Sequence, residues 1–404
     1  MMAPAARRYR FRPFDGRLAA LDRVLLLAAL GLAFLGLVMV ASASVTIGDR
    51  NFGAPLHYFW KQALTFSISV VLSVFLVRPG LVAWERAGGP LLVACIAMLA
   101  LILVPGLGRT VNGATRWLPL GFWNLQPSEL MKLGVVVYVA GYLVRRADEV
   151  RSSLWGFVKP VALLSIIGVL LLLEPDYGTT VVLVATVLVL LFLGGVPWPT
   201  YLAWVAVIGA GLVLLAVAAP YRLQRLMSFW DPWGDPYASG FQLTQALIAI
   251  GRGTWTGVGL GGSVQKLFYL PEAHTDFLFA VLGEELGFVG MTVVIGLFLI
   301  VIWRAFQIGA RAERAGKTFA ANLAYGIGLM LGLQAFINIG VNLGVLPTKG
   351  LALPLMSYGG NSLAINVLAI ALLLRASYES PEAAAAGPVG SPGERRDAPG
   401  GHVQ

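Results

Sequence analysis

Long apolar runs separated by shorter polar segments make up most of this chain. A helix needs about 20 apolar residues to cross a bilayer, whereas the strands of a membrane β-barrel alternate over about ten residues. The apolar runs have the length of helical spans and lack that alternation. They predict ten spans, at 24–44, 57–77, 89–105, 129–145, 159–174, 178–194, 199–219, 276–303, 319–343 and 353–375.

The composition agrees with this pattern. Hydrophobic residues make up 58% of the chain and charged residues 12%, about half the charged fraction of a soluble domain. The fold class we predict is an all-α polytopic membrane protein. The single cysteine, Cys95, lies inside an apolar run, which excludes a disulfide scaffold. The first run ends in Ala41-Ser42-Ala43 like a signal peptide, but it is longer than a usual signal, so we expect an uncleaved first span.

The positions of Lys and Arg predict the orientation. Short segments after every second span are rich in cations, and so is the stretch before the first span, which indicates that both termini are cytoplasmic. The net charge of +9 is therefore explained by topology and anionic lipid, with no nucleic acid partner. We expect a basic N-terminus at 1–23, a membrane domain at 24–375 and a disordered cytoplasmic tail at 376–404.

The polar segment 220–275, between the seventh and eighth spans, is unusually long for a connection. By the charge rule it is extracytoplasmic. Its length and its content of aromatic residues and glycines suggest a built site. We expect it to form one wall of a binding site and to close as a lid, with Trp230, Trp233, Tyr237, Trp255 and Tyr269 stacking on a ligand; membrane anchoring of these aromatics is the alternative.

Three titratable residues end this segment: Glu272, His274 and Asp276. Asp276 lies where a helix should begin, so it either caps backbone amides or carries chemistry. If the helix begins there, Asp276 and Glu284 share one of its faces. Carboxylates inside a membrane are costly and usually face the protein interior. The stacked pair therefore favours a functional role.

A second cluster precedes the fourth span. Arg109 and Arg116 lie in the predicted outer loop, Ser128 is a plausible helix cap, and Glu129 and Lys132 follow. Glu129 and Lys132 are three residues apart, which suits an intrahelical ion pair. Arg109, Arg116 and Lys132 on one surface would equally suit a phosphate or pyrophosphate. The sequence leaves these two interpretations open.

Further polar groups lie at or near helix ends. Glu174 and Asp176 surround a helix break, where they either cap the next helix or, with another carboxylate such as Glu284, bind a divalent cation. Gln334, Asn338 and Asn342 form a polar stripe on the ninth span, where amides usually join helices. Lys349 and Ser357 lie in glycine-rich segments that allow close backbone approach to a ligand.

Three stretches of the sequence are distinctive: Ser228 to Tyr237, Gln265 to Phe277 and Leu346 to Gly350. Together with the clusters above, they resemble the SEDS family (shape, elongation, division and sporulation) of bacterial cell-wall polymerases. The resemblance covers roughly residues 20–375 and is closest to the cell-division branch. Asn361 stands where the family commonly has Ser and Ala352 where Thr is usual, and neither difference removes a charge.

The resemblance implies a glycosyltransferase that polymerises lipid II into glycan strands on the outer face of the bacterial cytoplasmic membrane, at the division septum. Asp276 corresponds to the family's proposed catalytic base. A class B penicillin-binding protein, the division transpeptidase, is the implied partner, together with other membrane proteins of the division apparatus. Mg²⁺ or Mn²⁺ is compatible with this chemistry, and no organic cofactor is required. The substrate-binding residues we expect are Arg109, Arg116, Glu129, Lys132, Glu272, His274, Lys349 and Ser357.

Two other functions fit some of the same residues. A lipid II flippase would use Lys132, Glu284 and Glu285 to line a polar path across the membrane. A non-catalytic scaffold of the division apparatus would use none of them for chemistry. The lack of an obvious internal repeat and the concentration of the site on the outer side argue against the flippase. The cluster of titratable groups around Asp276 argues against the scaffold.

Overall fold

The structure, a computed structural model, describes residues 21–111, 113–121, 123–217, 228–238, 240–348 and 350–380. Ten long helices lie at the ten places where spans were predicted. They are α1 (Arg23–Phe52), α2 (His57–Val77), α3 (Leu81–Ile102), α4 (Pro127–Arg145), α6 (Leu154–Leu173), α7 (Tyr177–Leu193), α8 (Trp198–Val217), α11 (Leu278–Arg314), α12 (Thr318–Asn342) and α13 (Gly360–Glu379).

Eight of these helices are long and apolar enough to cross a membrane; α7 is an apolar helix of 17 residues and α8 has 20 residues. Several predicted bounds were wrong: α1 ends at Phe52 rather than 44, α3 begins at Leu81 rather than 89, and α11 ends at Arg314 rather than 303. Helix α13 begins at Gly360 rather than 353, because residues 351–359 are irregular backbone and turns, and it ends at Glu379, beyond the expected boundary at 375. The expected basic segment and tail lie almost wholly outside the described residues.

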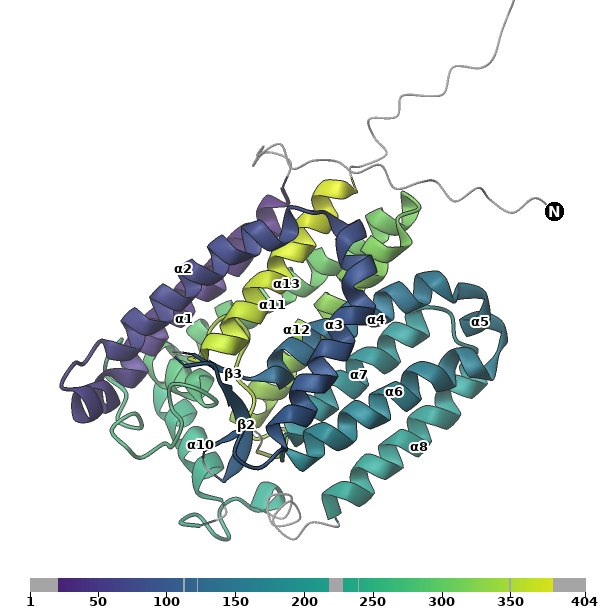
Figure 1. The fold of residues 1–404 in the computed structure, drawn as a ribbon. Helices are drawn as coiled ribbons and strands as arrows, with labels where there is room; N and C mark the ends of the chain where they lie inside the picture. The colour runs from purple at the N-terminus through teal and green to yellow at the C-terminus, as the bar shows by residue number, and fades with distance from the viewer. Residues whose placement is uncertain are drawn as a thin grey trace, which may run out of the picture.

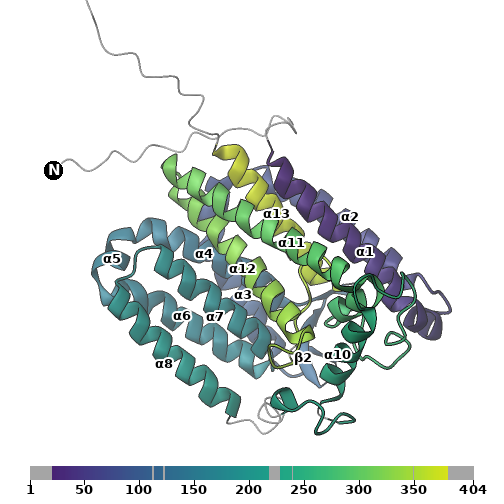
Figure 2. The ribbon, with the colours of Figure 1, turned by 180° about the vertical axis from the view of Figure 1, so that it is seen from behind.

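Helix α4 lies at the centre of the bundle, with most of its side chains buried. It contributes to two hydrophobic cores. One core joins it to α1, α11, α12 and α13, and the other joins it to α3, α6 and α7. Figures 1 and 2 show α8 on the outside of the second group.

Five short elements were not predicted, and four of them, the three strands and α10, lie at one end of the bundle. The strands β1 (Arg109–Val111), β2 (Ala114–Pro119) and β3 (Asn124–Leu125) form a small antiparallel sheet in the order β1-β2-β3. Helix α10 (Phe241–Gly253) lies at the same end, and the short α5 (Ala147–Ser152) links α4 to α6. The first residues of α1 and the last residues of α13 lie at the opposite end (Figure 1).

Helix α11 is broken at Gly287, where φ is 64° and ψ is −163°. A break in a membrane helix frees backbone groups that need partners within the protein. The segment after α10 supplies them: the amides of Val258 and Gly259 donate to the carbonyls of Glu284 and Glu285, at 3.0 Å each. A Cβ atom on Gly287 would lie 2.4 Å from the backbone nitrogen of Gly257, so only glycine permits this contact.

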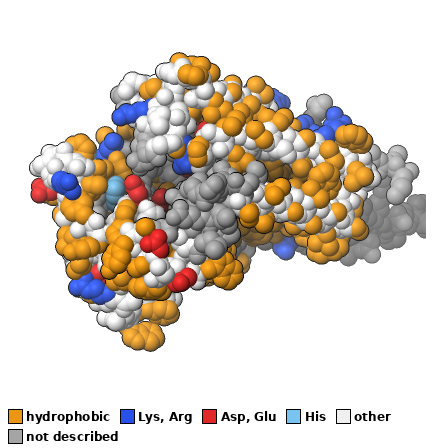
Figure 3. All heavy atoms as spheres, turned by 90° about the horizontal axis from the view of Figure 1, so that it is seen from below, with side chains coloured by type: hydrophobic (Ala, Val, Ile, Leu, Met, Phe, Trp, Pro, Cys, Tyr) orange, Lys and Arg blue, Asp and Glu red, His pale blue; other side chains and the backbone are white. Residues whose placement is uncertain are grey.

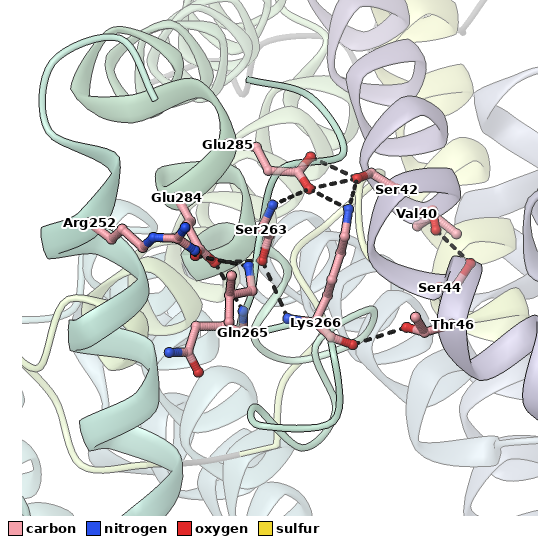
Figure 4. A network of polar contacts seen from close by, with 11 residues as sticks. Val40, Ser42, Ser44, Thr46, Arg252, Ser263, Gln265, Lys266, Glu284 and Glu285 are labelled. Atoms are coloured by element: carbon pink, nitrogen blue, oxygen red, sulfur yellow. Dashed lines mark hydrogen bonds and ion pairs between the residues drawn. The ribbon is translucent and has the colours of Figure 1, made fainter. Parts of the chain in front are cut away.

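Charged side chains also bind the segment that follows α10 to α11 and α1 (Figure 4). Glu284 accepts hydrogen bonds from Arg252 at 2.8 Å and from the Ser263 hydroxyl at 2.5 Å. Glu285 accepts from Lys266 at 2.8 Å and from Ser42 of α1 at 2.7 Å. Both carboxylates are fully buried. The network thus joins α1, α10, α11 and the loop into one unit.

We expect Lys266→Met to destabilise the protein strongly, because it leaves the Glu285 carboxylate buried without its cation. Breaking a buried pair typically costs about 3–5 kcal/mol. Thermal unfolding in detergent measures the loss. The double variant Lys266→Met with Glu285→Leu should recover part of it, since replacing both ions by apolar groups is often tolerated.

The matched control is Lys159→Met, which removes the cation of the exposed pair between Lys159 and Glu149. An exposed pair contributes about 0–1 kcal/mol, so this variant should unfold close to the wild-type temperature. Equal losses for Lys159→Met and Lys266→Met would contradict a structural role for the buried pair.

Candidate active site

A cavity of about 990 Å³ opens at the end of the bundle that carries the sheet and α10. Figure 3 looks onto this face, where charged side chains of both signs gather on the side toward α1 and α2. Residues of α2, the sheet, α4, α7, α10, the start of α13 and the irregular segments between these elements line the cavity. The charged residues among them are Lys61, Arg109, Arg116, Glu129, Asp176, Glu272 and Asp276. The sequence had singled out all of these except Lys61.

Asp276 lies at the start of α11, half-buried in the cavity wall. Its backbone carbonyl accepts hydrogen bonds from the side-chain amides of Asn338 and Asn342, at 2.9 and 3.0 Å. A Cβ atom on Gly350 would lie 3.1 Å from Asp276 Oδ2, so the backbone at 350 packs closely beside the carboxylate. The glycine there serves the close approach that the sequence suggested.

The expected face shared by Asp276 and Glu284 is not formed. Helix α11 begins at Leu278 with Phe277 at its N-cap, so the helical periodicity does not extend back to Asp276. Glu284 instead binds Arg252, Ser263 and the backbone amide of Val264. Only Asp276 of the two lines the cavity.

His274 is held away from the cavity by aromatic packing. Its ring centroid lies 5.0 Å from that of Tyr58 on α2 and 5.5 Å from that of Tyr358. Its carbonyl accepts a hydrogen bond from the amide of Tyr358 at 3.0 Å. Burial lowers the pKa of His274, so the ring is neutral at physiological pH. The ring therefore packs between α2 and Tyr358, and His274 is not among the residues that line the cavity.

The three predicted cations occupy two different environments. Arg109 and Arg116 line the cavity, and Arg116 donates to the backbone carbonyls of Glu174 and Pro175. Lys132 is fully buried beneath the cavity, 2.9 Å from Glu129 and 2.9 Å from the side-chain oxygen of Gln334. The ion pair of Glu129 with Lys132 is thus present, and of these three predicted cations only the two arginines line the cavity.

The remaining predicted binding residues have separate places. The exposed Glu272 lines the cavity and accepts from the Thr275 hydroxyl at 2.7 Å. Ser357 is buried, and its hydroxyl accepts from the amide of Leu353 at 2.9 Å, so it holds a turn rather than lining the cavity. Lys349 lies outside the described residues. Ser128 is not the cap of α4, because the helix begins one residue earlier and Gln126 is its N-cap.

The three candidate metal ligands do not come together. Asp176 caps α7 by accepting from the amide of Thr179 at 3.2 Å, as one of the two alternatives had it. Glu174 is fully buried, and Glu284 is bound in the network of Arg252. Among the described residues, no group of three or more His, Cys, Asp or Glu side chains is placed to hold a metal ion.

The aromatic residues of the 220–275 segment do not form the cavity wall. Trp230, Trp233, Tyr237, Trp255 and Tyr269 are all more than half exposed, and none lines the cavity. Its described residues contribute Gln242, Pro271, Glu272 and Thr275 to the lining. The end of the segment therefore forms part of the cavity wall, whereas these five aromatic side chains lie outside the lining. Their stacking on a ligand and closure of the segment as a lid stay predictions.

Sequence reasoning missed several lining residues. Trp123 donates to the side-chain oxygen of Asn361 at 2.9 Å, and Asn361 donates to the carbonyl of Asn124 at 2.8 Å. Gln62 of α2 donates to the carbonyl of Ser357 at 3.0 Å. Asn361, which departs from the family pattern, therefore joins the sheet to the start of α13. The dipeptide Asn112-Gly113, a hairpin signal, could have revealed the sheet.

Glu174 makes stability depend on pH. Burial raises its pKa from 4.5 to about 8, the neighbouring Asp176 adds to the rise, and Arg116 opposes it. A carboxyl whose pKa is raised in the folded state binds its proton more tightly there than in the unfolded chain. Stability is then lost as pH rises from about 4.5 to about 8.

We expect Glu174→Gln to unfold at the wild-type temperature near pH 4.5 and at a higher temperature than wild type above pH 8. The amide imitates the protonated acid and never becomes charged. Thermal unfolding of both proteins across this pH range measures the divergence. The same temperature difference at every pH would show that Glu174 does not titrate in this range.

Comparison with known proteins places the chain in a family. The model of the FtsW, RodA and SpoVE family, described as cell cycle protein, matches residues 22–382. A probable peptidoglycan glycosyltransferase FtsW from Nitrosococcus halophilus is 56% identical over 359 residues, covering 89% of this chain and 92% of that protein. The probable peptidoglycan glycosyltransferase FtsW of Legionella pneumophila is 49% identical, covering 94% of this chain and 96% of its own.

Solved structures have the same fold. A chain of a peptidoglycan synthase complex, in a study of the structural coordination of polymerization and crosslinking, gives a TM-score of 0.72 at 30% identity, covering 89% of this chain and 98% of its own. The rod shape determining protein RodA of Thermus thermophilus gives 0.66 at 28% identity, covering 91% and 99%. These similarities, with the long apolar helices, show that the chain is a multi-pass membrane protein of the SEDS family, in the branch of the FtsW proteins.

Proposed function

We propose that this protein is a peptidoglycan glycosyltransferase that polymerises lipid II on the outer face of the cytoplasmic membrane during cell division, at the septum. The observation that carries the proposal is the composition of the cavity: the carboxylate of Asp276 and the guanidinium groups of Arg109 and Arg116 line the same space. Relatives about half identical over most of the chain are named peptidoglycan glycosyltransferases.

The reaction joins two sugars and releases a pyrophosphate. The oxygen of the acceptor GlcNAc 4-OH attacks C1 of the donor sugar, while the bond from C1 to the undecaprenyl pyrophosphate oxygen breaks and that oxygen takes the electron pair. Asp276 accepts the hydroxyl proton as general base. A single displacement inverts the α-linked donor to a β-linkage and needs no covalent enzyme intermediate.

The two arginines stabilise the leaving group. Negative charge develops on the pyrophosphate as the bond to C1 breaks, and preorganised cations in a partly dry cavity stabilise such charge effectively. Guanidinium groups suit phosphate oxygens because two parallel N–H donors match two oxygens. Arg116 is already oriented by the carbonyls of Glu174 and Pro175. Lys132 supports this wall indirectly, by fixing Glu129.

The described residues do not supply a protein cage for a metal, so no step of this mechanism uses one. We propose that any Mg²⁺ or Mn²⁺ reaches the site with the pyrophosphate, because such ions are commonly held by one or two carboxylates together with substrate phosphates.

A penicillin-binding protein completes the proposal. The similar structure belongs to a peptidoglycan synthase complex whose study concerns both polymerization and crosslinking. A polymerase that releases glycan strands needs a transpeptidase to crosslink them. We therefore propose a class B penicillin-binding protein, the division transpeptidase, as the partner of this chain.

We expect Asp276→Asn to abolish polymerisation while the protein stays folded and bound to its partner. Asn has nearly the same shape but cannot take a proton at neutral pH. The assay follows purified lipid II with the partner present and crosslinking blocked. Asp49→Asn, which neutralises an exposed carboxylate on α1 away from the cavity lining, is the control.

Polymerisation by Asp276→Asn at the wild-type rate would remove Asp276 from the mechanism. Polymerisation at the wild-type rate together with lost transfer of lipid II between leaflets would favour the flippase instead.

We expect Gly350→Val to lower the polymerisation rate, by about tenfold or more, because its side chain would crowd Asp276 Oδ2. Gly296→Ala on α11 is the control, since its added Cβ atom meets nothing within 4 Å and alanine favours a helix. Initial rates on lipid II, normalised to folded protein, measure the effect. A wild-type rate in Gly350→Val would show that the carboxylate does not need this close contact.

A further inference from the structure

Three buried amide side chains on one face of α12 contact the walls of the cavity. Gln334, Asn338 and Asn342 are spaced four residues apart, which places them above one another on a helix. Sequence reasoning assigned them to helix–helix contact. In the structure they bind mostly backbone atoms of the irregular segments that form the cavity.

Asn342 acts as a cap supplied by a neighbouring helix. Its side-chain oxygen accepts from the amide of Ala280 at 3.0 Å, and its side-chain nitrogen donates to the carbonyl of Asp276 at 3.0 Å. The first turn of any helix leaves backbone amides without intrahelical partners. The N-cap residue of α11, Phe277, makes no side-chain bond to them. Asn342 therefore fixes where α11 begins relative to α12.

Asn338 joins two walls. Its side-chain nitrogen donates to the carbonyl of Asp276 at 2.9 Å and to the carbonyl of Leu351 at 2.5 Å. Residues 350–352 line the cavity beside Asp276. One amide group thus sets the separation of the two segments that surround the Asp276 carboxylate.

Gln334 extends this arrangement to α4. Its nitrogen donates to the carbonyl of Ala352 at 2.9 Å, and its oxygen accepts from Lys132, which in turn pairs with the cavity residue Glu129. The three amides therefore connect the start of α11, the 350–352 segment and α4 through a single buried helix.

We infer that Asn338 and Asn342 are positioning residues for the reaction: they hold the backbone of Asp276 so that its carboxylate meets the acceptor hydroxyl. Gln334 holds the 350–352 segment and α4 in fixed positions relative to Asp276. The inference rests on the proposed function. These amides should affect the turnover rate rather than the affinity for substrate, because they contact the backbone of Asp276 and do not line the cavity. A misplacement of about 1 Å can lower a rate about 100-fold.

Asn338→Leu and Asn342→Leu test the inference, since Leu has a similar size and no hydrogen-bonding group. We expect the turnover of lipid II by folded protein to fall about 10- to 100-fold, with the number of lipid II sites per protein and their affinity within about threefold of wild type. Because both amides act on one carbonyl, the double variant should lose less than the product of the single losses. Asn322→Leu, near the beginning of the same helix, should keep the wild-type turnover.

Hydrogen exchange gives a readout that does not depend on activity. In Asn342→Leu the amide of Ala280 loses one of its two acceptors and keeps only the carbonyl of Phe277, at 3.1 Å, so exchange at 278–281 should become faster, while exchange in the middle of α12 should not change. Unchanged exchange at 278–281 would overturn the assignment of Asn342 as a cap.

The outcomes separate this inference from the proposed function. Wild-type turnover in both Leu variants, with Asp276→Asn inactive, would overturn the inference alone. If the Leu variants lose lipid II binding sites to the same extent as they lose turnover, the inference is also overturned, because the amides would then serve only to keep the protein folded. Absence of lipid II polymerisation by the wild-type protein with its partner would overturn the proposed function itself.

Discussion

Irregular backbone inside a membrane protein must find its hydrogen-bond partners within the protein, and this requirement shapes the whole cavity region. Lipid cannot donate or accept such bonds. The chain breaks its helical order at the start of α11, at Gly287 and between α12 and α13. At the start of α11 and before α13, amide side chains of α12 supply the partners. At Gly287, the backbone that follows α10 supplies them.

This arrangement gives the cavity two walls of different chemistry. One wall holds Asp276 and is tied to the central helix α12. The other holds the arginines on the small sheet, and Arg116 ties that sheet to the connection between α6 and α7. A general base needs a fixed position relative to its acceptor, and cations need a fixed position relative to the departing charge. In the proposed mechanism, the amides of α12 hold the backbone of Asp276, and the carbonyls of Glu174 and Pro175 hold Arg116.

The amino-acid sequence predicted the helices better than the contacts between them. A helix lies at each of the ten predicted places, and eight of these helices are long and apolar enough to cross a membrane, because apolar length is a local property. The start of α11 was misplaced by two residues, and this displacement was enough to pair Asp276 wrongly with Glu284. The buried positions of Lys132 and His274 depend on α12 and α2, which are distant in the sequence, so their environments were not predictable from local pattern. The Asn112-Gly113 dipeptide could have predicted the hairpin of the small sheet. The partners of Glu284 could not be predicted in this way, because they come from segments distant in the sequence.

The most direct test of the account is the structure of this protein, with its penicillin-binding partner, bound to lipid II or a non-hydrolysable analogue. The account predicts the acceptor GlcNAc 4-OH within hydrogen-bond distance of the Asp276 carboxylate, and the donor pyrophosphate against Arg109 and Arg116. A pyrophosphate bound outside this cavity, or an acceptor hydroxyl out of reach of Asp276, would contradict it.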